Sequence, residues 1–105
     1  MLILGKGKYK VWLEKKKIGR DIVYLLGGGE KPHIGSIVVC EPGKKTRITK
    51  SEGHYDHIVL KPIAETACKK YKTKVVAIGG IHIDNASKRE IDIIVENCHG
   101  LLKKL

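Results

Sequence analysis

The segment Asp21-Ile22-Val23-Tyr24-Leu25-Leu26 is a nearly continuous apolar run, and Gly27-Gly28-Gly29 follows it directly. An apolar run without alternation is typical of a strand that is covered on both faces. We therefore predict a central strand over residues 21–26 and a glycine-rich loop after it. Strand-forming composition predicts four further strands, at 9–14, 34–40, 44–51 and 74–78.

The spacing of apolar residues changes to a helical period after Gly53. One helical stripe is formed by Val59, Ile63, Thr66, Ala67 and Tyr71. Proline is tolerated mainly in the first turn of a helix, so Pro62 leaves two alternative starts, near Asp56 with a bend or near Leu60. A second helix is predicted to begin near Ser87, because Ser-Lys-Arg-Glu from that position has the spacing of a capping box.

The predicted order of elements is β-β-β-β-α-β-α, in a single domain over residues 1–105. A chain of this length can bury roughly two-thirds of its unfolded surface in one core. The expected fold class is α+β, with a mixed, mainly antiparallel sheet and two helices packed on it.

Glycine and histidine concentrate in three short segments, which hold four of the five histidines and seven of the twelve glycines. They are 27–35 (Gly-Gly-Gly-Glu-Lys-Pro-His-Ile-Gly), 53–57 (Gly-His-Tyr-Asp-His) and 79–85 (Gly-Gly-Ile-His-Ile-Asp-Asn). If the predicted strands alternate in direction, all three segments and both helix N-termini reach one end of the sheet. This inference depends on the short strand at 44–51, and it predicts one common site.

The residues of this site leave three interpretations open. In the first interpretation the chain is a metal-dependent enzyme, because residue types that bind metals are present. These residues are His33, His54, His57 and His82, with Asp56 or Asp84. Glycine backbones and helix N-termini instead favour an anion such as a phosphate, and this interpretation also explains the glycines. In the third interpretation the glycines form turns, the histidines are structural, and the chain is a protein-interaction module.

The net charge of +10 raises the question of nucleic-acid binding. The lysines are scattered along the chain, and one tryptophan with four tyrosines gives little material for stacking on bases. We therefore do not expect a nucleic-acid partner, whereas an anionic small ligand or an acidic protein suits this charge. The abundance of lysine and glutamate with few amides suits an archaeal or thermophilic source.

The three cysteines, Cys40, Cys68 and Cys98, lack CxxC spacing, so we expect buried, reduced thiols. No apolar run is long enough to span a bilayer. The sequence Met1-Leu2-Ile3-Leu4 leads directly into Gly5 and Lys6, unlike a signal peptide. The expected location is the cytoplasm, with no membrane contact.

The glycine and histidine pattern resembles a known family. Gly-Gly-Gly…His-Ile-Gly over 27–35, Gly-His at 53–54 and Gly-Ile-His-Ile-Asp-Asn at 80–85, in this order, are similar to small proteins encoded beside UbiD-type decarboxylases. These are the gallate-decarboxylase subunit-D-like proteins, described as prenylated-flavin chaperone-like domains. The resemblance extends from about Lys8 to Leu102, and Pro32 and Pro62 fit its pattern least well.

The resemblance implies a fold related to proteasome-assembly chaperones, a homodimer, and a non-enzymatic role. That role is to hold FMN or prenylated FMN for a UbiD-type decarboxylase partner. The residues carried over by position to the cofactor site are Gly28, Gly29, His33, Gly35, His54, Gly80, His82, Asp84 and Asn85. In this hypothesis glycine N–H groups and helix N-termini bind the phosphate, and the three histidines donate to the phosphate or the ring. It assigns no catalytic residue and no metal ligand.

Overall fold

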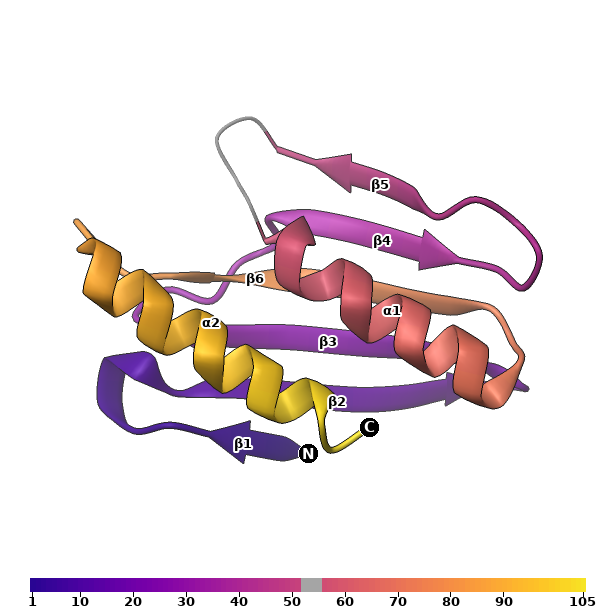
Figure 1. The fold of residues 1–105 in the computed structure, drawn as a ribbon, viewed down its shortest axis with the longest axis horizontal. Helices are drawn as coiled ribbons and strands as arrows, with labels where there is room; N and C mark the ends of the chain where they lie inside the picture. Colours follow the sequence, from indigo (N-terminus) through magenta and orange to yellow (C-terminus); the bar gives the residue numbers. More distant parts are fainter. Residues whose placement is uncertain (52–55) are drawn as a thin grey trace.

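The computed structural model describes residues 1–51 and 56–105 (Figure 1). Within them lie the strands β1 (Leu2–Leu4), β2 (Val11–Ile18), β3 (Asp21–Gly29), β4 (Ser36–Cys40), β5 (Arg47–Lys50) and β6 (Val75–His82). The helices are α1 (His57–Tyr71) and α2 (Lys88–Leu102), and a short 3₁₀ turn, η1, covers Gly7–Tyr9.

The strands form one sheet with the order β1-β2-β3-β6-β4-β5. Only β3 and β6 pair in parallel among the described strands, and the other neighbours are antiparallel. The parallel pair arises because α1 carries the chain back along the sheet before β6 begins, the usual role of a crossover helix. The predicted class, an α+β fold with a mixed, mainly antiparallel sheet and two helices, is confirmed.

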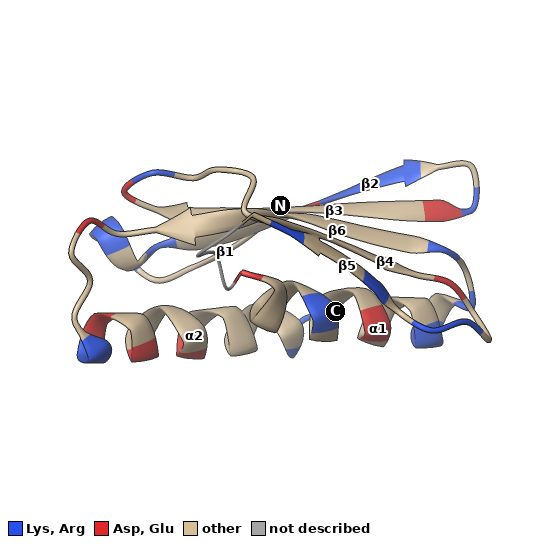
Figure 2. Cartoon of the chain, turned by 90° about the horizontal axis from the view of Figure 1, so that it is seen from above, with Lys and Arg blue, Asp and Glu red and all other residues tan. Residues whose placement is uncertain are grey.

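Both helices pack on the same face of the sheet (Figures 1 and 2). Helix α1 lies against β4 and β6, and α2 lies against β1 and β2. The side chains buried between these layers include Leu13, Tyr24, Leu60, Ile63 and Leu101. No described helix covers the opposite face, where half-buried apolar side chains gather: Trp12, Val23, Leu25, Ile37, Val39, Val76 and Ile78.

The sheet differs from the prediction at β1, at the glycines of β3, and at β6, which extends beyond the predicted range of 74–78 to His82. Strand β1 was not predicted, because three residues are too short for an alternating pattern; its Leu2 and Leu4 nevertheless pack against the core. The three glycines at 27–29 belong to β3 instead of a loop. They stay in the sheet because β3 is paired along this whole stretch, with β6 up to the Gly29–His82 pair.

Both helices begin close to the positions predicted from the sequence. Helix α1 begins at His57, directly after Asp56, so the earlier of the two alternative starts is the one observed and Pro62 lies inside the helix. Helix α2 begins with the predicted capping box, in which Ser87 and Glu90 bond each other's backbone N–H groups. No helix in the described part of the chain has the length and apolar content needed to cross a bilayer.

Candidate functional site

The end of the sheet at which β3 and β6 finish brings the glycine and histidine segments together. Gly29 pairs with His82 at the ends of these two parallel strands. Strand β4 starts at the same end, since Ser36 pairs with Gly79. The first and third segments therefore share one end, as predicted. Of the second segment, Asp56 and His57 lie at the start of α1, whereas His54 lies outside the described residues.

Asp56 is the polar residue that joins these elements. Its Oδ1 accepts a hydrogen bond from the backbone N–H of Ile81 at 3.0 Å, and its Oδ2 lies 3.5 Å from Nε2 of His33. The side chain is only 11% exposed, so both contacts are sheltered from water. Through them Asp56 attaches the first turn of α1 to β6 and to the loop between β3 and β4.

Two motif glycines make room for this carboxylate. A Cβ atom on Gly35 would overlap Oδ2 of Asp56, and a Cβ on Gly80 would lie 2.8 Å from the same oxygen. Neither glycine has a positive φ. Their lack of a side chain is therefore required by space rather than by backbone conformation.

Other glycines of the three segments take part in the backbone hydrogen bonding and close packing of the sheet. Gly29 has a φ of 73°, a conformation that favours glycine, and its N–H donates to the carbonyl of Lys10 at 3.0 Å. The N–H of Gly35 donates to the carbonyl of Gly79 at 2.9 Å. These two donors are used within the backbone, so the expectation that they bind a phosphate is not met. Gly28 also lies inside β3, close to Val11 and the Lys10 carbonyl.

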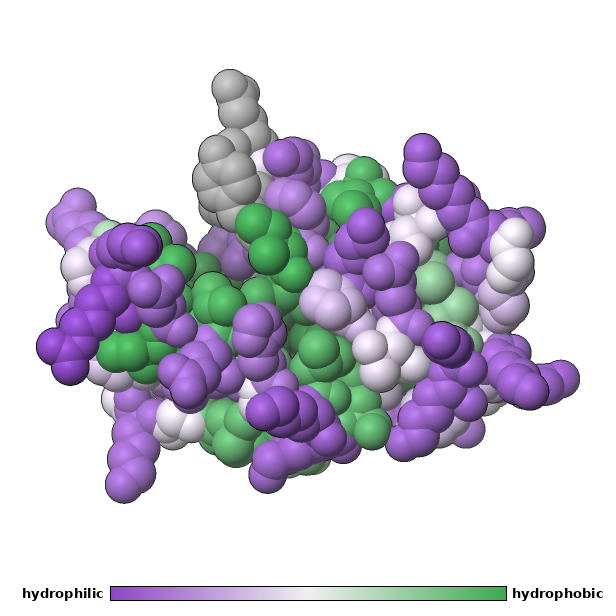
Figure 3. Space-filling view, in the orientation of Figure 1, coloured by the Kyte–Doolittle hydropathy of each residue, from purple (hydrophilic) through white to green (hydrophobic). Residues whose placement is uncertain are grey.

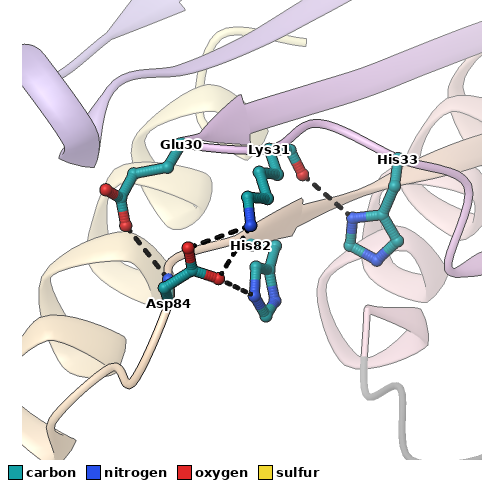
Figure 4. A network of polar contacts seen from close by, with 5 residues as sticks. All are labelled: Glu30, Lys31, His33, His82 and Asp84. Atoms are coloured by element: carbon teal, nitrogen blue, oxygen red, sulfur yellow. Dashed lines mark hydrogen bonds and ion pairs between the residues drawn. The ribbon is translucent and has the colours of Figure 1, made fainter.

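A polar network lies on the outside of this sheet end (Figure 4). Asp84 is 3.0 Å from Nε2 of His82 and 3.0 Å from Nζ of Lys31, and its backbone N–H donates to Glu30 at 3.0 Å. The pKa of Asp84 is lowered from its ordinary value, first by the hydrogen bond from Lys31 and then by that from His82. The network joins the end of β6 to the residues that follow β3.

His33 and His82 lie side by side at this end. Their ring centroids are 6.1 Å apart and the rings are nearly perpendicular. Nδ1 of His33 lies 3.2 Å from the carbonyl oxygen of Lys31 (Figure 4), and each histidine has a carboxylate beside its Nε2. Both ring nitrogens of His33 therefore contact groups of the chain itself, and Nε2 of His82 contacts Asp84.

The remaining predicted residue, Asn85, lies in the turn before α2 with a φ of 51°. Asparagine tolerates this left-handed conformation better than most residues, which gives Asn85 a structural role in the turn. At the start of α2 itself, the Glu90 carboxylate accepts the N–H of Ser87. A negative charge already occupies the positive end of this helix, so it is a poor place for an anion.

An apolar groove adjoins the polar residues on the helix side of the sheet. It has a volume of about 330 Å³ and lies between the start of α1, the end of β6 and the first half of α2. We call it the α1–α2 groove. Its walls are mainly Ile58, Val59, Ile81, Ile91, Ile94 and Val95, with Asp56 and His82 as its polar borders. Figure 3 shows apolar surface between the two helices.

Sequence reasoning did not find this groove, nor the part that Asp56 takes in it. Ile91, Ile94 and Val95 have the spacing of one apolar helix face, but amphipathic spacing does not tell a filled interface from an open one. Asp56 was named only as a possible start of the first helix and among the residues of the metal interpretation.

The metal interpretation gains no support from the described residues. Across residues 1–51 and 56–105, no group of three or more His, Cys, Asp or Glu side chains is arranged to hold a metal ion. His57 is the first residue of α1, and its buried Nδ1 has no hydrogen-bond partner among these residues.

A comparison with models of known protein families identifies the family of this chain. A family model described as the prenylated flavin chaperone LpdD-like domain matches residues 5–105, which is nearly the whole chain. The chain belongs to the prenylated flavin chaperone LpdD-like family. A comparison with curated proteins gives no match. Membership of this family confirms the resemblance that the glycine and histidine segments indicated.

Proposed function

We propose that this LpdD-like chain is a non-catalytic chaperone that binds prenylated FMN at the end of β3 and β6. The observation that carries the proposal is the α1–α2 groove, an apolar space of about 330 Å³ bordered by His82 and Asp56. Small-molecule sites are typically clefts of roughly 300–1,000 Å³, mostly apolar, with few polar groups that orient the ligand. The family description names the ligand class.

The donor set suits a flavin better than it suits a metal. An isoalloxazine ring carries carbonyl oxygens and ring nitrogens, which pair with neutral or protonated imidazoles. We assign ligand contacts to His33, His82, Asp84 and Asn85, and also to His54. Gly28, Gly29, Gly35 and Gly80 contribute by close packing, since two of them leave the space that Asp56 occupies.

Binding of the cofactor to purified protein tests the proposal. We expect prenylated FMN to bind, and His82→Ala to weaken binding about tenfold, because a lost ligand hydrogen bond costs about 1–2 kcal/mol. His99→Ala is the matched control, since His99 is exposed near the other end of α2. Calorimetric titration measures both. Absence of binding by the unaltered chain, or equal affinities for the two variants, would contradict the proposal.

The recipient of the cofactor in this proposal is a UbiD-type decarboxylase. A chaperone must release its cargo, and a groove that is open at the surface supports exchange better than an enclosed cavity. We expect that the loaded protein activates an apo-decarboxylase of this type faster than free cofactor at the same concentration does. Equal activation rates with and without the chain would argue against this transfer role.

A further inference from the structure

We propose that the sheet end opposite the glycine and histidine segments is a docking surface for a protein partner with an acidic surface. This end consists of the segments around three connections: the β2–β3 turn (residues 15–21), the β4–β5 loop (residues 41–47) and the α1–β6 turn (residues 69–75). We call it the basic end. The proposal goes beyond flavin binding and does not depend on it, because none of these residues lines the α1–α2 groove.

Positive charge that is scattered in the sequence is gathered at the basic end by the fold. Its three segments hold eleven of the 21 lysines and arginines of the chain and two of its eleven acidic residues. All eleven cations are exposed. Eleven cations less two carboxylates leave nine of the ten net positive charges of the chain at this end (Figure 2).

The three segments form one surface because neighbouring strands carry them side by side. Strand β6 lies between β3 and β4 in the sheet, so the α1–β6 turn lies between the other two segments. The Thr73 hydroxyl donates to Asp21 at 2.8 Å, and Nζ of Lys74 lies 3.5 Å from Oε1 of Glu41. These side-chain contacts join the turn to both of its neighbours.

The carboxylates near the basic end are too few to neutralise it. Glu41 lies within 3.5 Å of three cations, from its own loop and from the α1–β6 turn. Besides the two carboxylates of the segments themselves, Glu14 is 3.2 Å from Lys16, and Glu65 accepts the Thr46 hydroxyl at 2.6 Å. Eleven cations therefore face these four carboxylates, and the excess attracts an acidic surface and steers it toward this end.

An aliphatic and an aromatic side chain stand among these charges. Ile18 ends β2 and is 68% exposed, and Tyr71 ends α1 and is 40% exposed. Nζ of Lys15 lies 4.2 Å from the centre of the Tyr71 ring, and Nζ of Lys70 lies 5.3 Å from it. In protein interfaces a few large side chains of this kind supply affinity, whereas the surrounding charges supply orientation and association rate.

The arrangement favours a protein over a nucleic acid as the partner. Nine of the eleven cations are lysines, whereas arginine is the residue that pairs with a phosphate through two hydrogen bonds. The Tyr71 ring already contacts two ammonium groups, so it is a poor platform for a stacked base. Ile18 gains free energy from apolar contact, which a protein surface offers and a phosphate backbone does not.

Docking at the basic end leaves the α1–α2 groove open. The groove and the basic end lie apart along the longest axis of the molecule, which extends over 38 Å (Figure 1). A small ligand in the groove and a partner at the basic end can therefore be bound at the same time.

Binding of two synthetic peptides, measured by fluorescence anisotropy, tests the proposal. One is a poly-glutamate peptide with leucines interspersed, and the other is plain poly-glutamate of the same length; we expect the first to bind more tightly. Lys17→Glu with Arg20→Glu should weaken its binding about tenfold, because two charges beside Ile18 are reversed. Lys88→Glu with Arg89→Glu is the matched control, since it changes the net charge equally on exposed residues at the start of α2. Its effect should stay below about twofold, because salt screens charges at this distance.

A second readout locates the contact without any substitution. Isoleucine methyl spectra should shift at Ile18 when the leucine-containing peptide is added, and not at Ile3, which is 52% exposed on β1. Equal affinities for the two peptides, equal losses in the two double variants, no shift at Ile18, or tighter binding of a DNA duplex at physiological salt would each overturn the proposal. None of these measurements involves a flavin, so such a failure is distinct from a failure of the proposed function.

Discussion

Gly35 and Gly80 show how a motif residue can be required by a neighbour distant in sequence. Both have ordinary backbone conformations, and both lie against the Asp56 carboxylate. The sequence predicted correctly that His33 and His82 would meet, because strand direction can be counted. It could not predict why the glycines are there, since composition does not separate a need for space from a need for positive φ.

A double-mutant cycle tests this explanation at Gly35. Gly35→Ala should lower the free energy of unfolding by about 1–3 kcal/mol, because the new methyl group overlaps the Asp56 carboxylate. In an Asp56→Ala background the same change should cost much less, since the obstructing oxygen is gone. Urea unfolding of the four proteins measures the coupling. Additive effects of the two substitutions would show that Asp56 is not the reason for the glycine.

Helix α2 shows what local sequence signals can and cannot predict. Its capping box at Ser87 was predicted, because both partners lie within four residues of each other. The extent of β3 was mispredicted, because three glycines indicate a loop until the pairing partner β6 is known. The openness of the α1–α2 groove was likewise not predicted, since it depends on how far two helices sit apart.

The cap of α2 also predicts a pH dependence. The pKa of Glu90 is lowered from 4.5 to about 2, first by the hydrogen bond from Lys8 and then by that from the Ser87 backbone. A lowered folded-state pKa adds stability above the unfolded value, and that stability is lost as the pH falls toward 2. We expect the free energy of unfolding to drop between about pH 4.5 and pH 2.

Glu90→Gln should make this drop smaller, whereas Glu96→Gln, the same change on an exposed part of the same helix, should leave it as it is. Thermal unfolding followed by circular dichroism across this range measures the effect. Identical pH profiles for Glu90→Gln and the unaltered chain would show that the Lys8–Glu90 pair does not cause the loss of stability at low pH.

For the whole molecule, the bare face of the sheet is the face opposite the two helices, and no helix in the described part of the chain covers it (Figure 2). Apolar side chains from β2, β3, β4 and β6 meet there, and such a surface is typical of an interface. We propose that two copies pair through it. The net charge of +10 opposes this association, so salt should strengthen the dimer.

Sedimentation velocity tests the homodimer. Val39→Glu places a carboxylate on the bare face and should give monomers, because an unpaired charge would be buried between the copies. Ile48→Glu is the control, since β5 alternates and Ile48 points to the other side of the sheet from Val39. A monomer for the unaltered chain at high salt, or dimers for both variants, would reject this interface.

The position of β6 has a consequence for how the chain reaches its fold. Strand β6 is inserted between β3 and β4, although it is made last among the strands. Until residue 82 has left the ribosome, β3 and β4 each present an open edge, and unpaired edges invite association with other chains. Closing the sheet also requires contacts between residues far apart in sequence, which slows folding. The β2–β3 hairpin can form early, but the β3 and β4 sides of the proposed flavin site come together only when β6 joins them, and α2, which lines the groove, follows β6 in the chain.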